Sequence, residues 1–431
     1  MSSNSTILSG PRIDLYRKNN IRIGILHSGG PAPGGNRVHL AAALRAKDHG
    51  ISLVAFKHGY EHLMSKSPKE INSNWVIEIG REEIRHFRDQ LFLLSGSARA
   101  NPGKKISTID DLKDSEKTAA LTNVLEVFGA LNVGAIISVG GDDSMRTANL
   151  LQKHFENQKA KGKSFGDFEG IVHVPKTVDK DYPGIDFTFV FMTAAQVLGD
   201  RVRNLHADAR ATATSTQLVY HVVEIMGRAA GWLTAAASIY GNATLAIVPE
   251  DYIDRDDLTL QELAEKCVDA MLTRKNQGKN YGVLAISEGL GDVIKSIDAE
   301  KDEFGHTRFA EADLRGDLKR SITKELAKRC DLKVKIIDHR AGYESRQVSP
   351  NIFDDLLCKT LGVAAVDAIL KGQFGNMLSV EGVFSPKLVP FDDLIDPVTL
   401  KVKSWVMSRN EGLHKLMKDM QQPFETDVDK L

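Results

Sequence analysis

The sequence predicts an α/β protein made of two Rossmann-like lobes, each with three layers of helices and a mostly parallel sheet. Apolar runs typical of strands alternate with runs of helical spacing along most of the chain. Such alternation favours parallel sheets that have helices on their faces. The length of 431 residues also exceeds what one ordinary core accommodates, so we expect more than one lobe.

The first firm unit follows a polar stretch, residues 1–20, that we interpret as an N-terminal extension. A strand is expected at 21–26, and it leads into a glycine-rich turn at 28–35. A segment of helical spacing follows at 38–46, and a second strand at 51–56. Strand, turn, helix and strand in this order predict a βαβ unit.

The alternation continues through the rest of the chain. Further strands are expected at 135–139, 171–174, 218–225, 244–248, 281–287 and 333–338. Helices are expected just before Leu131 and at 144–156, 191–210, 228–239, 258–274, 321–329 and 351–370. The charged segment 292–316 is interpreted as an exposed loop, and the last 45 residues as irregular up to a final helix around 402–420.

We place the boundary between the lobes near residue 212. The first lobe is expected to span 21–212 and the second 213–375, with 376–431 packing back on the first. Neither a Pro-rich nor a Gly-rich linker separates the halves, which favours closely packed lobes.

The composition points to a small-molecule partner. Hydrophobic residues make up 42% of the chain, enough to fill the cores, and 56 Lys and Arg nearly cancel 57 Asp and Glu. That balance argues against a broad nucleic-acid surface and leaves room for a local basic pocket. No apolar run approaches the roughly 20 residues of a membrane span, and the first residues lack the pattern of a signal peptide, so we expect a cytoplasmic protein without a membrane partner.

The three cysteines are interpreted as reduced core thiols. Cys267, Cys330 and Cys358 lie far apart, each in a run of helical spacing, and none belongs to a CxxC or Cys/His pattern. Their spacing therefore predicts neither a disulfide framework nor a metal site.

A group of polar residues suited to phosphoryl transfer follows the strand at 171–174. Lys176, Thr177, Asp179 and Asp181 come directly after it, and open α/β sheets bind ligands at the carboxyl ends of their strands. Either carboxylate could accept the proton of a hydroxyl group. The structural alternative is an acidic turn neutralised by its own lysines.

A second acidic group follows the strand at 135–139. Gly140 and Gly141 allow a sharp turn, and Asp142, Asp143 and Ser144 begin the next helix. An aspartate that holds Mg²⁺ while the ion bridges phosphates would explain two carboxylates at this place. Simple capping of the helix by Asp or Ser is the alternative.

Other candidate phosphate-binding groups are weaker when taken alone. The turn with Gly29 and Gly30 presents backbone N–H groups where a helix begins, although a plain tight turn has the same pattern. Arg99 could present its guanidinium to phosphate oxygens, or it could be an ordinary surface residue. Further candidates recur at the ends of later predicted strands, and each has a surface alternative: Met226, Gly227, Arg228, Glu288, Tyr343 and Arg346.

Together these motifs resemble the phosphofructokinase family, in order from about Ile21 to Gly375. The pieces that carry the resemblance are SGGPAPGGN, GSAR, GGDDS, PKTVDKD, MGR, ISEG and GYESR. The resemblance implies a Mg²⁺-dependent phosphotransferase that phosphorylates fructose 6-phosphate at its 1-hydroxyl group.

The resemblance also implies roles for individual residues. Asp179 would be the base that takes the proton of the sugar hydroxyl, with Asp181 and Thr177 beside it, and Asp142 would contact Mg²⁺. The donor side would be lined by Gly29, Gly30, Arg99 and Ser144, and fructose 6-phosphate would be held by Met226, Gly227, Arg228, Glu288, Tyr343 and Arg346.

Two positions favour pyrophosphate as the donor. ATP-using members usually have glycine where this chain has Asp143, whereas pyrophosphate-dependent members resemble it there and have lysine before Thr, here Lys176. A carboxylate at Asp143 would repel the α-phosphate of a nucleotide, and Lys176 can neutralise pyrophosphate oxygens. Pro31 stands where many ATP-using members have aspartate, which also fits the pyrophosphate branch.

Several alternatives stay open. The nearest is an ATP-dependent member of the same family, and a pyrophosphate-dependent member that also accepts sedoheptulose 7-phosphate is another. A nicotinamide-dependent dehydrogenase would need a GxGxxG sequence after its first strand, which is absent, and a non-catalytic sensor would lack the acidic motif. Val219 stands where tetrameric bacterial members place an arginine that reaches a neighbouring subunit, so we expect a homodimer.

Overall fold

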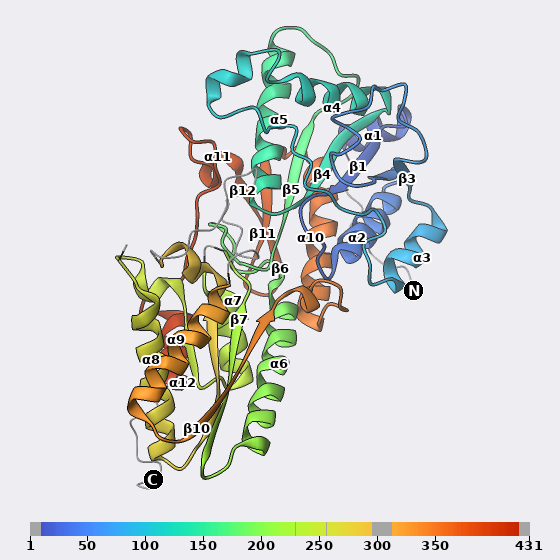
Figure 1. The fold of residues 1–431 in the computed structure, drawn as a ribbon. Helices are drawn as coiled ribbons and strands as arrows, with labels where there is room; N and C mark the ends of the chain where they lie inside the picture. The colour runs from blue at the N-terminus through green and yellow to red at the C-terminus, as the bar shows by residue number, and fades with distance from the viewer. Residues whose placement is uncertain (1–9, 229, 256, 295–312, 422–431) are drawn as a thin grey trace. The chain divides into compact units, whose positions relative to one another are not determined.

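The computed structural model describes residues 10–228, 230–255, 257–294 and 313–421, and Figure 1 labels their helices and strands. Contacts divide the chain into two compact units. Unit 1 comprises Met1–Thr177, Tyr182–Val190 and Arg346–Ser404. Unit 2 comprises Val178–Asp181, Phe191–Ser345 and Trp405–Leu431.

Unit 1 is built on one mostly parallel sheet. Its strands are β1 (Arg22–His27), β2 (Leu53–Phe56), β3 (Val76–Glu78), β4 (Val133–Gly140), β5 (Gly170–Thr177), β6 (Phe189–Val190), β11 (Asn376–Glu381) and β12 (Ser385–Pro390). The order is β12-β11-β5-β4-β1-β2-β3, and β6 pairs with β5 outside this path. The chain winds from β1 to β2 on one side and continues with β4 on the other, so the switch point at which α/β sheets bind ligands lies between β1 and β4.

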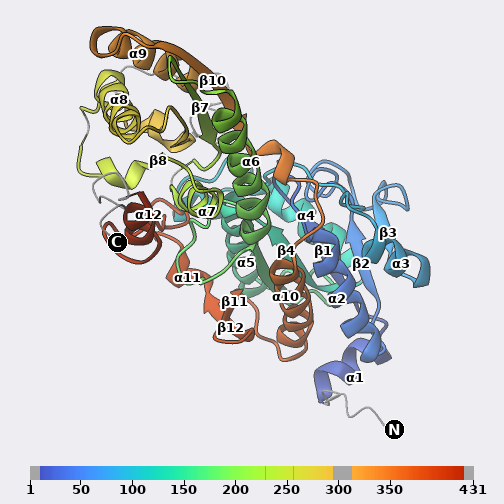
Figure 2. The ribbon, with the colours of Figure 1, turned by 90° about the horizontal axis from the view of Figure 1, so that it is seen from below.

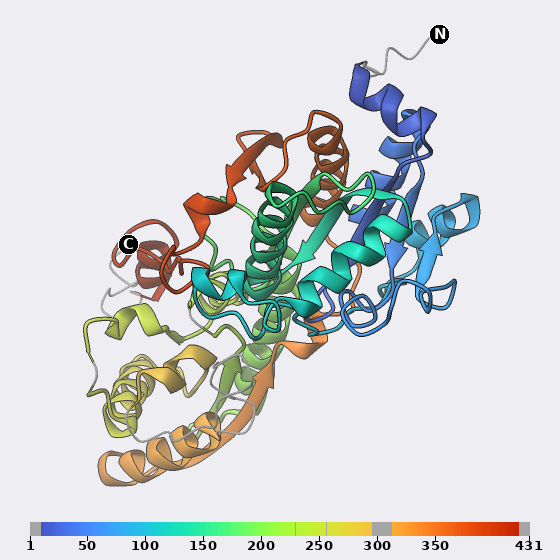
Figure 3. The same ribbon diagram turned by 90° about the horizontal axis from the view of Figure 1, so that it is seen from above.

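Helices cover this sheet in two groups. They are α1 (Pro11–Lys18), α2 (Gly35–Asp48), α3 (Arg81–Asp89), α4 (Ala119–Ala130), α5 (Asp142–Ala160), α10 (Ile352–Leu370) and the short α11 (Phe391–Leu394). α2 packs against α10 and α4 against α5, and Figure 3 shows α4 and α5 side by side over the strands. Every residue of β4 is buried, as expected for a parallel strand with helices on both faces.

Unit 2 contains a smaller sheet in which all strands are parallel. Its strands are β7 (Gln217–Ile225), β8 (Leu245–Ile247), β9 (Tyr281–Ser287) and β10 (Lys333–Ala341), in the order β10-β7-β9-β8. The helices are α6 (Phe191–Thr212), α7 (Trp232–Gly241), α8 (Leu260–Asn276), α9 (Leu314–Arg329) and α12 (Gly412–Gln421). α8 packs against α9, whereas α7 packs against α6 and α12, and Figure 2 shows α12 beside α7.

The two faces of the unit 2 sheet bury alternate residues of β7. Tyr220 and Val222 belong to the core under α8 and α9, and Val223 and Ile225 belong to the core under α6 and α7. This alternation follows from the two-residue period of a strand. The prediction of an α/β fold with mostly parallel sheets is confirmed.

The division into units does not coincide with the expected boundaries at residues 212 and 375. α6 belongs to unit 2 because it packs on α7, and α10 belongs to unit 1 because it packs on α2. The stretch 376–404 lies in unit 1, but the chain from Trp405 onward belongs to unit 2. Sequence periodicity does not indicate which sheet a helix covers, and for this reason the expected boundaries differ from those of the two units.

Several local expectations also need correction. The extension at 1–20 contains α1, whose Ile13 and Tyr16 are buried. The last 45 residues are not irregular at their start, because they begin within β12, which forms an antiparallel pair with β11, and the last described helix begins at Gly412 rather than near 402. Most of the loop expected at 292–316 lies outside the described residues.

The three cysteines are free thiols. Cys267 and Cys358 are buried as expected, whereas Cys330, which caps the C-terminus of α9, is only partly buried. None of the described helices is long and apolar enough to cross a membrane.

Candidate active site

Three strand ends of unit 1 meet at the switch point. His27 of β1 is opposite Val139 of β4, and Gly140 is opposite Pro175 of β5. All three strands run in parallel, so the residues that follow them emerge at one edge of the sheet. The Ser28 N–H donates to the Val139 carbonyl oxygen at 2.9 Å, which ties the first loop to the second strand.

The turn after β1 lies against the loop that carries Arg99. Gly29 has a φ of +84°, a conformation that favours glycine. Its N–H donates to the Ala98 carbonyl oxygen at 3.0 Å, and the Ser97 hydroxyl donates to the Gly29 carbonyl oxygen at 2.7 Å. The predicted glycine turn and the predicted arginine loop are therefore neighbours, with Arg99 itself exposed.

Lys176 lies at the end of β5, and its pKa is strongly lowered. Its ammonium group is buried and donates to the Ser28 carbonyl oxygen at 3.0 Å and to that of Gly30. Burial lowers the pKa of Lys176 to about 7, and the positive charges of Arg346 and Arg99 add to this effect. Positive charges that destabilise one another in this way favour the binding of an anion.

Arg346 also approaches the glycine turn. A side chain added at Gly30 would place its Cβ 3.9 Å from the Arg346 guanidinium carbon. This separation corresponds to ordinary van der Waals contact, so the guanidinium group lies directly beside the turn. Arg346 was predicted to hold the sugar phosphate, and it belongs to unit 1, as do the residues predicted for the donor.

The acidic residues after β4 lie in the first turn of α5. The residue that caps the helix is Gly141, and it makes no side-chain cap hydrogen bond. Asp142 and Asp143 follow it and are partly buried, and Ser144 is buried. The negative carboxylates are stabilised by the amino end of the helix, but capping by the side chain of the cap residue does not explain them.

The side chains at this edge of the sheet fit a Mg²⁺ ion whose other ligands are phosphate oxygens and water. No group of three or more His, Cys, Asp or Glu that could hold a metal ion occurs in the described parts of the chain. Mg²⁺ is commonly bound by one or two carboxylates together with substrate phosphates and water. The Asp142 carboxylate is the predicted protein ligand for such an ion.

Asp179 belongs to unit 2, because the chain passes from unit 1 to unit 2 after Thr177. The Asp179 carboxylate is buried, and its Oδ2 lies 3.8 Å from Nε of Arg228. The predicted base is thus beside a residue predicted to bind the sugar phosphate. The guanidinium group of Arg228 thus places a positive charge next to the predicted base.

Glu288 follows β9 at the same edge of the unit 2 sheet. It accepts a hydrogen bond from the Gly227 N–H at 3.3 Å. Burial raises the pKa of Glu288 above its usual value, the Gly227 N–H opposes the rise, and the carboxylates of Glu224 and Asp179 add to it. A proton on Glu288 would therefore be held more readily here than in water.

The other predicted substrate residues lie at neighbouring strand ends. The Met226 N–H, after β7, donates to the Ala341 carbonyl oxygen of β10 at 3.0 Å. Tyr343 follows β10 and is 61% exposed. The structure gathers Asp179, Met226, Gly227, Arg228, Glu288 and Tyr343 in unit 2, and Gly29, Gly30, Arg99, Asp142, Asp143, Ser144, Lys176, Thr177 and Arg346 in unit 1.

The sequence analysis missed a partly buried ion pair next to the unit 2 group. Glu224 of β7 is paired in register with Arg340 of β10, and Nε of Arg340 donates to Oε1 of Glu224 at 2.9 Å. Glu224 precedes Met226 by two residues and is buried. The signal available in the sequence was Glu224, the one Asp, Glu, Lys or Arg of the mostly apolar strand β7.

The chain is similar to known proteins over most of its length. The family model described as "Phosphofructokinase" matches residues 22–369. The "Pyrophosphate--fructose 6-phosphate 1-phosphotransferase" of Thermotoga maritima is 33% identical over 396 residues, which cover 89% of this chain and 86% of that protein. The protein of the same name from Naegleria fowleri is 31% identical, with 91% and 86% covered.

A relative of different name and a solved structure extend the comparison. The "ATP-dependent 6-phosphofructokinase 3" of Streptomyces coelicolor is 29% identical, with 84% of this chain and 91% of that protein covered. The pyrophosphate-dependent phosphofructokinase from Nitrosospira multiformis has a similar fold, with a TM-score of 0.68, 19% identity, and 94% and 92% of the two chains covered. The chain belongs to the phosphofructokinase family.

Proposed function

We propose that this protein transfers a phosphoryl group from pyrophosphate to the 1-hydroxyl group of fructose 6-phosphate, giving fructose 1,6-bisphosphate and phosphate in a reversible reaction. The observation that carries the donor assignment is the buried Lys176 ammonium beside the charges of Arg99 and Arg346. The names of the relatives from Thermotoga maritima and Naegleria fowleri, which match over most of the chain, support the same reaction.

The residues of unit 1 hold the donor. Lys176, Arg99 and Arg346 supply positive charge, and the turn at Gly29 and Gly30 leaves room for a phosphate group close to the backbone. A dianionic phosphate group raises the pKa of Lys176 again and keeps the ammonium charged. Phosphoryl transfer depends mainly on such charge neutralisation and positioning.

Magnesium is expected to act with these residues. The carboxylate of Asp142 would hold the ion, with the remaining ligands supplied by pyrophosphate oxygens and water. The ion would neutralise the phosphate oxygens and orient the donor.

The residues of unit 2 act on the acceptor. Asp179 takes the proton of the 1-hydroxyl group as the hydroxyl oxygen forms a bond with phosphorus, and the bridging P–O bond of pyrophosphate breaks to release phosphate. Arg228 lies beside this carboxylate, with its Nε 3.8 Å from Oδ2 of Asp179. Glu288 is suited to a hydrogen bond with a sugar hydroxyl group. Met226, Gly227 and Tyr343 complete the acceptor side. Thr177 and Asp181 are close neighbours of the base in the chain.

The second candidate is an ATP-dependent phosphofructokinase, which the name of the Streptomyces coelicolor relative favours. Asp143 argues against it, because a carboxylate in the first turn of α5 would repel a nucleotide phosphate next to the pyrophosphate position. Whether sedoheptulose 7-phosphate is also an acceptor is a separate question, which the same assay with that sugar answers.

Assays of the purified protein with each donor test the proposal. We expect robust turnover of fructose 6-phosphate with pyrophosphate and Mg²⁺, and little with ATP. Robust turnover with ATP and none with pyrophosphate would contradict it. A homodimer is our proposal for the assembly, and sedimentation velocity with and without fructose 6-phosphate tests it.

A further inference from the structure

Lys180 stands between Asp179 and Asp181 in an unusual conformation. Its φ is +54°, a left-handed backbone conformation that is costly for a residue with a Cβ atom. Such strain persists where surrounding contacts enforce it, often beside a functional site. The contacts that enforce it here involve the side chain of Lys180.

The Lys180 ammonium group lies among three aromatic rings. Its Nζ is 4.3 Å from the ring centroid of Trp232, 5.1 Å from that of Trp405 and 5.8 Å from that of Phe191. The two indole rings are 5.0 Å apart, and Nε1 of Trp232 donates to the Trp405 carbonyl oxygen at 3.4 Å. A cation held over indole rings is stabilised by their π-electrons, so these rings offset the cost of the backbone conformation.

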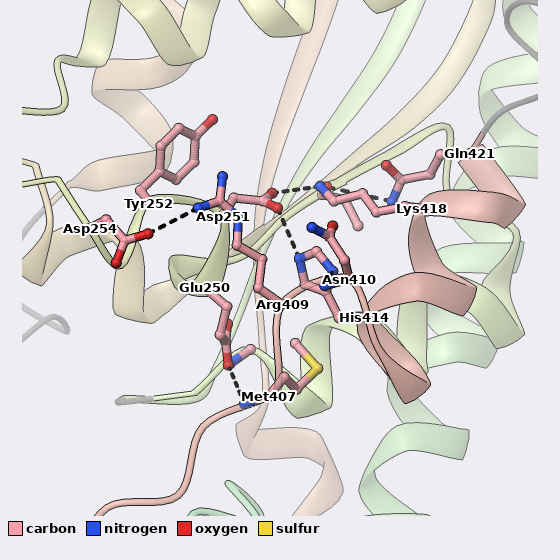
Figure 4. Close-up of polar contacts among 12 residues, drawn as sticks. Glu250, Asp251, Tyr252, Asp254, Met407, Arg409, Asn410, His414, Lys418 and Gln421 are labelled. Atoms are coloured by element: carbon pink, nitrogen blue, oxygen red, sulfur yellow. Dashed lines mark hydrogen bonds and ion pairs between the residues drawn. The ribbon is translucent and has the colours of Figure 1, made fainter.

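Trp405 begins a segment of the chain, residues 405–421, that we name the C-terminal clasp. The Trp405 N–H donates to the Asp181 carbonyl oxygen at 2.8 Å. Two residues later the Met407 N–H donates to Oε1 of Glu250 at 3.2 Å, a contact visible in Figure 4. The clasp is therefore bound at its start both to the acidic stretch and to the loop after β8.

Ion pairs fix the rest of the clasp to that loop (Figure 4). The Asn410 N–H donates to Nδ1 of His414, which leaves the proton on Nε2, and Nε2 lies 3.0 Å from Oδ1 of Asp251. Lys418 lies 2.6 Å from the other oxygen of Asp251, and Arg409 lies 3.2 Å from Asp254. Burial acts to raise the pKa of Asp251, but Lys418 and Lys266 hold it below its usual value.

Glu250 connects the clasp to the loop of Arg228. Its carboxylate accepts the Gly231 N–H at 2.9 Å as well as the Met407 N–H. Gly231 caps α7 three residues after Arg228, and Trp232 is the first residue of that helix. The clasp thus contacts the chain at Asp181, two residues after Asp179, and at Trp232, four residues after Arg228.

We propose that Lys180 and Trp405 are positioning residues, which hold the Asp179 carboxylate in place for proton transfer by locking residues 179–181 against the C-terminal clasp. The inference rests on the proposed function, because it assigns Asp179 as the base. Neither residue needs to touch the sugar or the donor. Their loss should misplace the carboxylate and leave the binding residues of unit 2 intact.

The first test replaces Trp405. We expect Trp405→Ala to lower kcat about 10- to 100-fold, the size of effect that a misplacement of about 1 Å produces, while the Kd for fructose 6-phosphate from calorimetry stays within about threefold of the wild-type value. Trp405→Phe keeps an aromatic ring over Lys180 and should recover most of kcat. Leu416→Ala, at an exposed position of α12, is the matched control and should behave as the wild type.

The second test replaces Lys180 and leaves the Trp405 backbone hydrogen bond in place. Lys180→Met should lower kcat with little change in KM, and Lys180→Arg, which retains a cation, should restore it. Lys180→Gly removes the cation and tolerates the left-handed conformation, so it should fold well and still lose kcat. If Trp405→Ala does not fold, the Lys180 variants decide the matter.

The outcomes separate this inference from the proposed function. A wild-type protein that turns over neither pyrophosphate nor ATP contradicts the proposed function. An active wild type with Trp405→Ala or Lys180→Met folded and equally active overturns only the role of the clasp. A parallel loss of kcat and of fructose 6-phosphate affinity would also overturn it, because that result indicates a general structural defect.

Discussion

The strand ends of the two units carry opposite kinds of charge arrangement. In unit 1 the Lys176 ammonium is buried near two arginines. Its burial and their positive charges lower its pKa. In unit 2 the buried carboxylate of Asp179 is paired with Arg228, and that of Glu224 with Arg340. The comparison teaches that the cations around Lys176 favour the binding of an anion, whereas each of these two carboxylates of unit 2 already has an arginine beside it.

The largest effect is expected from replacing Asp179, the proposed acceptor of the proton of the sugar hydroxyl group. Asp179→Ala should lower kcat about 10²- to 10⁴-fold, the usual contribution of a general base. Binding of fructose 6-phosphate, measured by calorimetry, should stay nearly unchanged because the sugar contacts are made by other residues. Turnover close to that of the wild type would show that the base is misassigned.

A smaller effect is expected when Lys176, the buried lysine of unit 1, is replaced. Lys176→Met removes charge that the donor needs, so kcat/KM for pyrophosphate should fall on the order of 100-fold, corresponding to about 2.7 kcal/mol of transition-state stabilisation. The unfolding temperature without ligand should change little, because the loss of two hydrogen bonds is offset by the removal of a buried charge. A large drop in that temperature with unchanged kinetics would make Lys176 a structural residue.

The lowered pKa of Lys176 predicts a pH dependence of donor binding. Above pH 7 the group is mostly neutral in the free protein, and pyrophosphate binding should restore its proton. Binding should therefore weaken as pH rises through about 7, with uptake of a proton that calorimetry in two buffers detects. In the absence of ligand, the depressed pKa makes stability rise with pH between about 7 and the usual lysine value. Lys176→Met is the control, and proton uptake in that variant would assign the effect to another group.

The smallest effect concerns the choice of donor. Asp143→Gly removes a carboxylate from the first turn of α5, and we expect the ratio of ATP to pyrophosphate turnover to rise about tenfold, equivalent to about 1.4 kcal/mol. Competition by ATP in the pyrophosphate assay provides an independent measure of binding. An unchanged inhibition constant for ATP would contradict the charge argument at this position.

Much of this picture could be predicted from local sequence patterns. The alternation of apolar runs indicated both parallel sheets, and polar residues directly after strands indicated candidates such as Lys176 and Glu288. These features depend on residues close in the chain. The edge of a parallel sheet then brings the strand ends together without further information.

The features that could not be predicted depend on contacts between distant parts of the chain. Arg346 lies just beyond the point at which the chain returns to unit 1, and nothing in its motif indicates that its charge acts on Lys176. The aromatic rings around Lys180 come from Trp232 and Trp405, which are far apart in the sequence. The C-terminal clasp could not be predicted for the same reason, because its partners Glu250 and Asp251 follow a different strand.

The most direct measurement follows pyrophosphate itself by phosphorus NMR in the presence of fructose 6-phosphate and Mg²⁺. The account predicts that the pyrophosphate signal decreases while signals of inorganic phosphate and of a new sugar 1-phosphate grow in equal amounts. Excess phosphate added to fructose 1,6-bisphosphate should regenerate pyrophosphate. A pyrophosphate signal that stays constant, in a preparation that consumes ATP and forms the same sugar product, would contradict the account.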